Sequence, residues 1–483
     1  HGIHPDQHSI VTNPADWKQF VETGDGGVVR SNGNFVDDSA DCPSVVVPSS
    51  IPANTAARLA LCQAVTKRIP ERIESINKGL NNLHFYQVTF NPNRPGELAG
   101  GAQDNGSWMR VPGTKTWVET FVADGAYNGF DAVDPNYSMF SWQGGSLAVL
   151  DQPRNQEAGT WISDTLLVTG AAPFRYNREL AAFIAPTLFH PNVSKLMFTG
   201  REHVFRSLNG GINPGFPFAD VKEHCNVCTG KGDIDESGAY VPSIDVCDDW
   251  KAMGDPGHGG RLTYGPAAAC PPPGAAALDP WTVACPAPYP WGTDRSGGHI
   301  SANEPAPSDQ NVVWAATSGG RIFVTTNAAA ANPATIAWTR IDPSSSVDPP
   351  RYPTDIYIDP SDPNHAYITY SGYNHVTPDT PGHVFEVTYN PTTGAATFTR
   401  LDGSGPHAIG DLPVGTIERD EKKGTLYAGT DFGVIRRVNA GTGWTSVAPG
   451  LPTTTVPFLK IDQDNGVMYV TTHGFGAWQF KLP

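Results

Sequence analysis

The sequence predicts an all-β protein, a β-propeller of about seven or eight four-stranded blades. A strand–turn–strand–hairpin–strand pattern recurs along the 483 residues, and 51 glycines and 44 prolines supply the turns it needs. The aromatic content of 12 Trp, 15 Tyr and 21 Phe is sufficient for a continuous core. Tandem sandwiches would need units of about 100 residues, so repeats of roughly 35 to 50 residues favour the propeller.

Eight copies of the repeat can be aligned. They begin at His8, Phe85, Phe130, Pro186, Asn311, Thr354, Gly415 and Phe458. A turn that typically reads Asp-Pro or Asn-Pro joins the first two strands, and a glycine-rich hairpin follows. Within strands the side chains alternate, as in Ile356 and Ile358 against Tyr357 and Asp359. The copies could form one ring or part of a larger, ten-bladed propeller.

Two segments interrupt the repeat. Residues 49–80 carry apolar residues between Lys and Arg, which predicts a short helical insert. Residues 211–297 contain five of the seven cysteines and are too long for a plain loop, so we expect a disulfide-braced insertion there. The expected organisation is therefore propeller blades in 1–210, the insertion in 211–297 and further blades in 298–483.

The overall charge limits the classes of partner. A net charge of −16 and a pI near 5.2 argue against nucleic acid or an anionic membrane surface. No apolar run is long enough to predict membrane insertion. The cysteines and the three sequons that begin at Asn105, Asn136 and Asn192 favour a secreted, extracellular or periplasmic protein. We expect the numbered chain to be a mature or trimmed product, because it begins with His1 and lacks a signal peptide.

The cysteine spacing predicts two disulfides, Cys42–Cys62 and Cys270–Cys285. The pairing of Cys225, Cys228 and Cys247 is open between disulfides and zinc. Nearby, Asp233, Asp235 and Ser237 followed by a glycine match the front of a calcium loop. Ca²⁺ is therefore the expected cofactor, and a solvated acidic turn is the alternative.

The run from His4 through Gly24-Asp25-Gly26-Gly27 to Ser31, with Gly100-Gly101-Ala102-Gln103-Asp104-Asn105-Gly106, resembles the Asp-box (BNR) propellers. That group includes sortilin-type ten-bladed domains, sialidase-fold enzymes and xyloglucanases. The resemblance implies a secreted propeller that is carbohydrate-directed or ligand-binding. No copy matches the full Asp box, and no order of Arg, Tyr and Glu fits sialidase chemistry.

Two carboxylates are the first candidates for catalysis. Asp104 and Asp124 precede glycine at blade hairpins or linking loops, and a facing pair would suit an inverting glycosidase. Nearby aromatic side chains could stack on sugar rings: Trp108, Tyr127 and Trp142. The alternative is turn chemistry, in which the Asp side chains accept backbone N–H groups.

The N-terminal stretch offers a second kind of site. His4, Asp6 and His8 alternate, so one strand face would carry all three as ligands of a transition metal. Structural hydrogen bonding and direct catalysis are the alternatives.

Two functions remain open at this stage. A glycoside hydrolase-like propeller acting on a polysaccharide should have a cleft with facing carboxylates and exposed aromatic residues. A non-catalytic propeller of sortilin type, which binds protein or serves a structural role, should instead use the same Asp residues in backbone hydrogen bonds. Neither substrate nor oligomeric state follows from the sequence.

Overall fold

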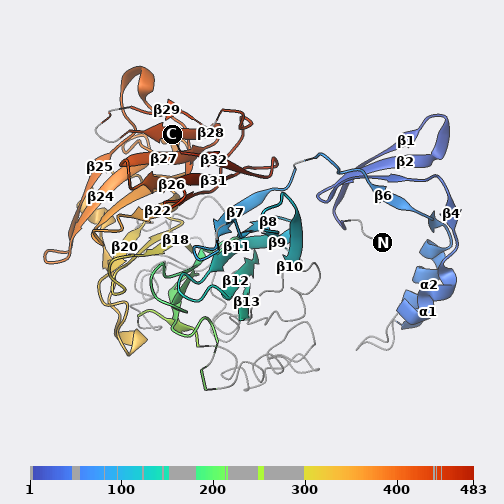
Figure 1. Ribbon diagram of the computed structural model, residues 1–483, viewed down its shortest axis with the longest axis horizontal. Helices are drawn as coiled ribbons and strands as arrows, with labels where there is room; N and C mark the ends of the chain where they lie inside the picture. The colour runs from blue at the N-terminus through green and yellow to red at the C-terminus, as the bar shows by residue number, and fades with distance from the viewer. Residues whose placement is uncertain are drawn as a thin grey trace, which may run out of the picture. The chain divides into compact units, whose positions relative to one another are not determined.

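The computed structural model (Figure 1) describes a chain of two compact units, His1–Asn82 and Leu83–Pro483. The described residues are 4–45, 55–80, 82–94, 96–121, 124–143, 146–151, 181–212, 214–215, 249–254, 299–438, 441, 443–447 and 449–482. None of the helices in these ranges is long and apolar enough to cross a membrane.

The first unit combines an antiparallel sheet with a helical segment. The sheet has the order β1-β2-β3-β6 (Gln7–Asn13, Asp16–Gly24, Gly27–Ser31, Ile73–Ser75), and a second ladder pairs β4 (Phe35–Val36) with β5 (Ile69–Pro70). In the chain, β4 and β5 are separated by η1 (Ser39–Asp41), α1 (Cys42–Val45) and α2 (Thr55–Thr66). The helix α2 falls within the predicted helical insert.

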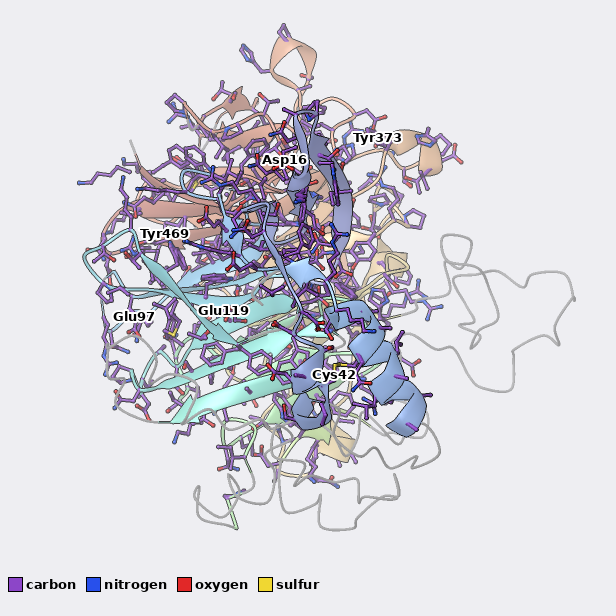
Figure 2. The ribbon with its side chains drawn as sticks, turned by 90° about the vertical axis from the view of Figure 1, so that its right-hand side faces the viewer. Asp16, Cys42, Glu97, Glu119, Tyr373 and Tyr469 are labelled. Carbon is purple, nitrogen blue, oxygen red and sulfur yellow. A yellow bond between two sulfur atoms is a disulfide. The ribbon has the colours of Figure 1, made fainter. Side chains whose placement is uncertain are left out.

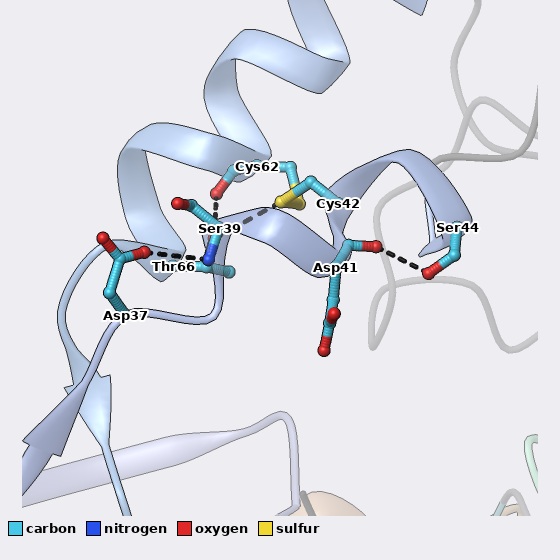
Figure 3. Close-up of a disulfide and its surroundings, with 7 residues drawn as sticks. All are labelled: Asp37, Ser39, Asp41, Cys42, Ser44, Cys62 and Thr66. Carbon is cyan, nitrogen blue, oxygen red and sulfur yellow. Dashed lines mark hydrogen bonds between the residues drawn. A yellow bond between two sulfur atoms is a disulfide. The ribbon is translucent and has the colours of Figure 1, made fainter.

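The Cys42–Cys62 disulfide is confirmed, with an S–S distance of 2.05 Å. It joins α1 to α2 (Figure 3), and Cys42 is only 1% exposed. The Thr66 hydroxyl donates to the Cys62 carbonyl at 2.7 Å, within the last turn of α2. The bridge therefore holds the two helices together in a unit with few large buried side chains.

The second unit contains seven antiparallel sheets, each a meander of neighbouring strands. In chain order they are β7–β10 (Phe85–Phe90, Leu98–Ala102, Gly106–Arg110, Trp117–Phe121), β11–β13 (Gly125–Phe130, Tyr137–Trp142, Ser146–Asp151), β14–β17 (Thr187–Phe189, Met197–Gly200, Val204–Ser207, Lys251–Ala252), β18–β21 (Ile300–Pro305, Val313–Thr317, Ile322–Thr325, Thr339–Arg340), β22–β25 (Pro353–Ile358, His365–Tyr370, Val384–Asn390, Ala395–Arg400), β26–β29 (Val414–Asp420, Thr425–Thr430, Gly433–Arg437, Thr445–Ser446) and β30–β32 (Leu459–Asp462, Val467–Thr471, Ala477–Lys481). Short 3₁₀ turns lie between strands: η7 (Pro333–Thr335), η8 (Asp342–Ser344), η9 (Asn374–Val376) and η10 (Gly405–His407).

The seven sheets close a ring, so the all-β propeller is confirmed. Each sheet contacts the next one, mostly through its first strand and, between the third and fourth sheets, through β15 and β18, and β30 and β31 return to contact β7. At this closure Tyr469 of β31, which is labelled in Figure 2, packs on Phe90 of β7 with ring centroids 5.8 Å apart. The Gly476 N–H also donates to the Leu83 carbonyl at 2.9 Å. The described strands of the last sheet, β30–β32, all come from the C-terminal segment. The first and last sheets are therefore joined by side-chain packing and this hydrogen bond, and not by a strand of one sheet that completes the other.

The structure places the predicted repeats in a different grouping. The copy from His8 is a four-stranded sheet as expected, but it belongs to the first unit, and the other seven copies correspond to the seven sheets of the ring. The strand β17 lies inside the range assigned to the insertion and is the fourth strand of the third sheet. The described part of the insertion range consists of residues 211–212, 214–215 and 249–254, and its remaining cysteines lie outside the described residues.

The core lies between neighbouring sheets. The largest cluster joins the sheets β18–β21 and β22–β25 through buried side chains such as Trp314, Ile356, Tyr370 and Phe385. Similar clusters join the other neighbouring sheets. Because apolar side chains fill these spaces, the polar side chains of the first strands must face the axis of the ring.

Candidate functional site

The first strands of the seven sheets place two layers of side chains around the axis. In every sheet the first strand pairs with the second across the turn that joins them. Counting from this turn identifies the equivalent residues of the seven first strands. One layer contains Gln87, Tyr127, Pro186, Ala302, Asp355, Thr416 and Phe458. Two residues further on, the second layer contains Thr89, Gly129, Leu188, Glu304, Tyr357, Glu418 and Lys460. Intervening residues such as Val88 and Ile417 pack into the inter-sheet cores.

All residues of the two layers except Thr416 line one cavity of about 440 Å³. Every sheet of the ring contributes to its wall, which makes it a central chamber. Its volume lies in the range of small-molecule sites, about 300–1,000 Å³. We refer to it below as the central cavity.

Opposite charges meet in the second layer. The Lys460 ammonium donates a hydrogen bond of 2.6 Å to the Glu418 carboxylate on the neighbouring strand. Burial lowers the pKa of Lys460, but Glu418, Glu304 and Asp355 more than offset this effect and raise it above its ordinary value. Burial raises the pKa of Glu418, and Lys460 partly opposes that shift. At neutral pH Lys460 is therefore a fixed positive charge in the cavity.

Glu304 differs from the other acidic residues of the cavity. Burial raises its pKa to about 8, with Lys460 lowering it and Asp355 and Glu418 raising it further. Among the described residues, no hydrogen-bond partner contacts its carboxyl group. Glu304 is thus largely protonated at neutral pH, and it has unused capacity to donate and accept hydrogen bonds.

Asp355 in the first layer has a structural role. Its Oδ2 accepts the Ile417 N–H at 2.9 Å and the Thr416 hydroxyl at 2.8 Å, while Oδ1 accepts the Ile356 N–H at 2.9 Å. Burial nevertheless raises its pKa, and these bonds partly oppose the rise. The carboxylate therefore joins the strands β22 and β26 across the boundary between two sheets.

The same connection recurs at two equivalent boundaries. The Gln87 side-chain oxygen accepts the Asn128 N–H at 2.6 Å, and the Thr416 hydroxyl accepts the Leu459 N–H at 3.3 Å. Each of these first strands carries a register shift just before the acceptor residue. Such a bulge leaves backbone groups unpaired, and a side chain of the preceding sheet satisfies the N–H of the next sheet.

Tyr127 is the one predicted ligand-binding residue that lines the central cavity. Its ring meets Phe458 of the same layer edge-on, with centroids 6.4 Å apart. Burial raises the pKa of its phenol, and the charges of Asp355 and Glu304 add to the effect. Tyr127 therefore presents a neutral, hydrogen-bonding aromatic group to the cavity.

The structure brings Asp104 and Asp124 together, but through the backbone. The Asp104 N–H donates to Asp124 Oδ1 at 3.0 Å, and Asp104 itself has a φ of 60°, which Asp tolerates in turns. Burial raises the pKa of the adjacent Tyr86 to about 12, and both carboxylates contribute. Tyr86 donates its hydroxyl to the Gln103 side chain. The Asp124 carboxylate thus accepts a backbone N–H, and the catalytic role of Asp104 and Asp124 stays a prediction.

Two histidines stack close to this cluster. His84 and His473 lie parallel, with ring centroids 3.9 Å apart, and His84 also contacts Tyr86. Burial and the neighbouring His473 lower the pKa of His84 to about 4, so this imidazole is neutral at physiological pH. The pair joins the first and last sheets of the ring.

The two predicted tryptophans pack against protein. Trp142 stacks on Phe121 at 4.6 Å, and the Trp108 indole donates to the Asn105 carbonyl at 2.5 Å while packing beside the cluster that closes the ring. Neither of them lines the central cavity.

In the first unit, His4 and Asp6 approach each other and Asp25, while His8 bonds to Asp25. The predicted calcium ligands Asp233, Asp235 and Ser237 lie outside the described residues, as do Cys270 and Cys285. These assignments stay predictions.

The charged residues of the cavity, Glu304, Glu418 and Lys460, were not singled out from the sequence. Their signal is positional, because all three lie at the same place in their repeats, paired with Trp314, Tyr427 and Tyr469 of the second strands. Aligning the first strands at their turns would have found them.

No protein-family model and no curated protein matches the chain. Among solved structures, the Swd1 β-propeller domain of Myceliophteria thermophila is 8% identical, with 83% of this chain and 97% of that chain covered and a TM-score of 0.48. YCF48 from Cyanidioschyzon merolae is 11% identical, with 84% and 96% covered and a TM-score of 0.49. The GH74 xyloglucanase of Xanthomonas campestris is 14% identical, with 83% of this chain but 52% of that chain covered and a TM-score of 0.45. The resemblance to Asp-box propellers stays a prediction.

Proposed function

We propose that the protein is a carbohydrate-binding β-propeller and that the central cavity is its binding site. The observation that carries the proposal is Glu304, a carboxyl group in the cavity wall with unused hydrogen-bonding capacity. Glu304 is half-buried, so water can reach its carboxyl group, and a ligand that supplies hydroxyl groups would replace that water with direct hydrogen bonds.

The remaining wall fits the same class of ligand. Lys460 and Glu418 offer a donor and an acceptor side by side. Tyr127 and Phe458 supply aromatic surface. Sugars present hydroxyl edges and apolar C–H faces, which is the combination that such a wall complements.

Isothermal titration calorimetry of the full chain with a panel of neutral and acidic oligosaccharides tests the proposal. At least one saccharide should bind, and Glu304→Gln, which keeps the shape but changes the hydrogen bonding, should weaken it about tenfold. Asp464→Asn, an exposed carboxylate of the last sheet, is the matched control and should bind like the native protein. If no saccharide binds, or if Glu304→Gln binds equally well, the alternative of a protein-binding propeller is favoured instead.

Glycoside hydrolysis is a second candidate, favoured by the raised pKa of Glu304. A carboxyl group that is protonated at neutral pH and lies among other carboxylates can act as a general acid. In this hypothesis the paired carboxylates are Glu304 and Glu418, in place of Asp104 and Asp124. Release of reducing ends that is lost in Glu304→Gln while binding persists would support hydrolysis, and binding without turnover would exclude it.

Export is part of the proposal, because the Cys42–Cys62 bridge requires an oxidising compartment to persist. Expression with and without access to such a compartment, followed by thiol counting, would test this point. Two free thiols at these positions in the natural protein would contradict it.

A further inference from the structure

A second site lies in the first unit, far in the sequence from the residues of the central cavity. His4, Asp6 and Asp25 each offer one ligand atom, and these three atoms lie within 4.8 Å of one another. His8 is outside this group of three, and its Nε2 forms a hydrogen bond of 2.6 Å with Asp25 Oδ1. Asp25 was not among the metal ligands predicted from the sequence.

The backbone brings the two ligand-bearing segments together. The Asp25 N–H donates to the Asp6 carbonyl at 3.1 Å, and Gln7 pairs with Gly24 at the start of the ladder between β1 and β2. The sheet thus fixes the positions of Asp6 and Asp25, although the two residues are 19 positions apart in the sequence. Such fixing is the preorganisation that a binding site requires.

Glycines allow this close approach. A side chain at Gly24 would meet the Asp6 carbonyl oxygen at 2.4 Å, and one at Gly26 would meet the His4 Cβ at 2.7 Å. Asn77 holds the far side of the loop, since its amide donates to the Gly26 carbonyl at 2.8 Å and accepts the Val28 N–H at 2.6 Å. The loop between β2 and β3 is therefore shaped around the His4–Gln7 segment.

The ligand atoms are accessible and chemically matched. The side chains of His4 and Asp25 are 15% and 28% exposed, whereas those of Asp6 and His8 are 65% exposed. One imidazole and two carboxylates form a set of three protein ligands that Zn²⁺ accepts in tetrahedral geometry, with a water molecule in the fourth position. Two nearby carboxylates repel each other, and a divalent cation between them would neutralise both charges.

We propose that His4, Asp6 and Asp25 bind a divalent transition-metal ion, with Zn²⁺ as the best fit, and that His8 orients the Asp25 carboxylate. Zinc–ligand distances of about 2.0–2.2 Å place neighbouring ligand atoms roughly 3.4 Å apart in a tetrahedron. His4 Nδ1 lies 3.7 Å from Asp6 Oδ2 and accepts the Asp6 N–H at 3.2 Å, so a bound ion would replace this N–H as the partner of Nδ1. The ion would fix the start of β1 to the β2–β3 loop, and it is independent of the function proposed for the central cavity.

Titration of the full, chelator-treated chain with Zn²⁺ tests the site, with Co²⁺ absorption as a report of tetrahedral geometry. We expect one ion per chain, and we expect Asp25→Asn and His8→Gln each to weaken binding about tenfold or more. Asp6→Asn alters a largely exposed side chain, so it keeps the test valid if another variant fails to fold.

Asp38→Asn in the same unit and His375→Gln in the ring are the matched controls, and both should bind like the native protein. Absence of saturable Zn²⁺ binding by the native chain would overturn the proposal. Equal binding by the native chain and the three site variants would do the same, because the ion would then lie elsewhere.

Discussion

Lys460 of β30 donates a hydrogen bond of 2.6 Å to Glu418 of β26, across the boundary between the last two sheets of the ring. Among the described residues that line the central cavity, Lys460 is the one that carries a positive charge. It faces Glu418 directly and is close enough to Glu304 and Asp355 to shift their pKa values. Burial is the main cause of the raised pKa values of these carboxyl groups, and this single ammonium group opposes it.

Replacing Lys460 with methionine should destabilise the ring by about 2 to 4 kcal/mol at pH 8, because Glu418 would remain buried without its partner. We place the value towards the lower end of the range for buried pairs, since Lys460 is 39% exposed. The loss should shrink at pH 5, where Glu418 can take up a proton. Urea unfolding at the two pH values measures both effects.

The double variant Lys460→Met with Glu418→Gln separates the lost pair from the lost packing. It should recover much of the stability, because the uncompensated charge is gone. A double variant as unstable as Lys460→Met alone would mean that the methylene packing of Lys460, rather than its charge, determines the loss.

Glu304 should make the stability of the ring depend on pH. Its folded pKa is raised to about 8, above the ordinary value of 4.5, so the neutral form stabilises the fold. This contribution is fully present below about pH 4.5 and is lost as the pH rises through 8. Glu304→Gln should therefore match the native protein near pH 5 and exceed it by about 1 to 2 kcal/mol at pH 9.

Thermal unfolding across this pH range provides the measurement, and Asp464→Asn serves as the exposed control. Parallel curves for the native protein and Glu304→Gln would contradict the raised pKa. The same variant reports on saccharide binding, so stability and binding can be compared in one protein.

Much of the ring was predictable because turns and alternation are local signals. The Asp359-Pro360 turn and the alternation around Ile356 and Ile358 place β22 and β23 correctly. The strand β18 escaped because an Ala306-Pro307 turn replaces Asp-Pro, and because the strand begins directly after the predicted insertion. The repeat pattern therefore places the start of this repeat at Asn311, which leaves Glu304 outside it.

The candidate site was harder to predict because it depends on how the sheets close. Asp104 and Asp124 were chosen for their turn context, and the structure uses that context for a backbone hydrogen bond. Glu304, Glu418 and Lys460 line one cavity only because strands from three different sheets, up to 156 residues apart in the chain, face one axis. A single repeat contains no information about which repeats become neighbours across the cavity.

The Cys42–Cys62 bridge should stabilise the first unit without affecting the ring. It closes a loop of 20 residues, which corresponds to about 3 kcal/mol in the chain-entropy model. The double variant Cys42→Ser with Cys62→Ser should lower the unfolding transition of residues 1–82 and leave that of residues 83–483 unchanged. Hydrogen exchange resolved by segment can follow both units, and a shift of both transitions would show that they unfold together.

The bonds of Asp355 should contribute more to stability than its position in a polar cavity suggests. Asp355→Ala would leave the Ile417 and Ile356 N–H groups without acceptors, and each buried unpaired donor costs about 1 to 3 kcal/mol. We expect a total loss of about 2 to 4 kcal/mol for Asp355→Ala. Asp355→Asn keeps one acceptor oxygen, so it should lose about half as much.

Gln87→Leu provides the matched test at an equivalent boundary, because it removes the acceptor of the single Asn128 N–H and keeps the side-chain volume similar. It should cost about 1 to 2 kcal/mol. Asp355→Ala should lose the most stability, and Asp355→Asn and Gln87→Leu should lose less, because they leave fewer N–H groups unpaired. Urea unfolding of the three variants measures this order. If Asp355→Ala were as stable as the native ring, water in the cavity would be satisfying the bulged strands, and the side-chain connection between sheets would not be a source of stability.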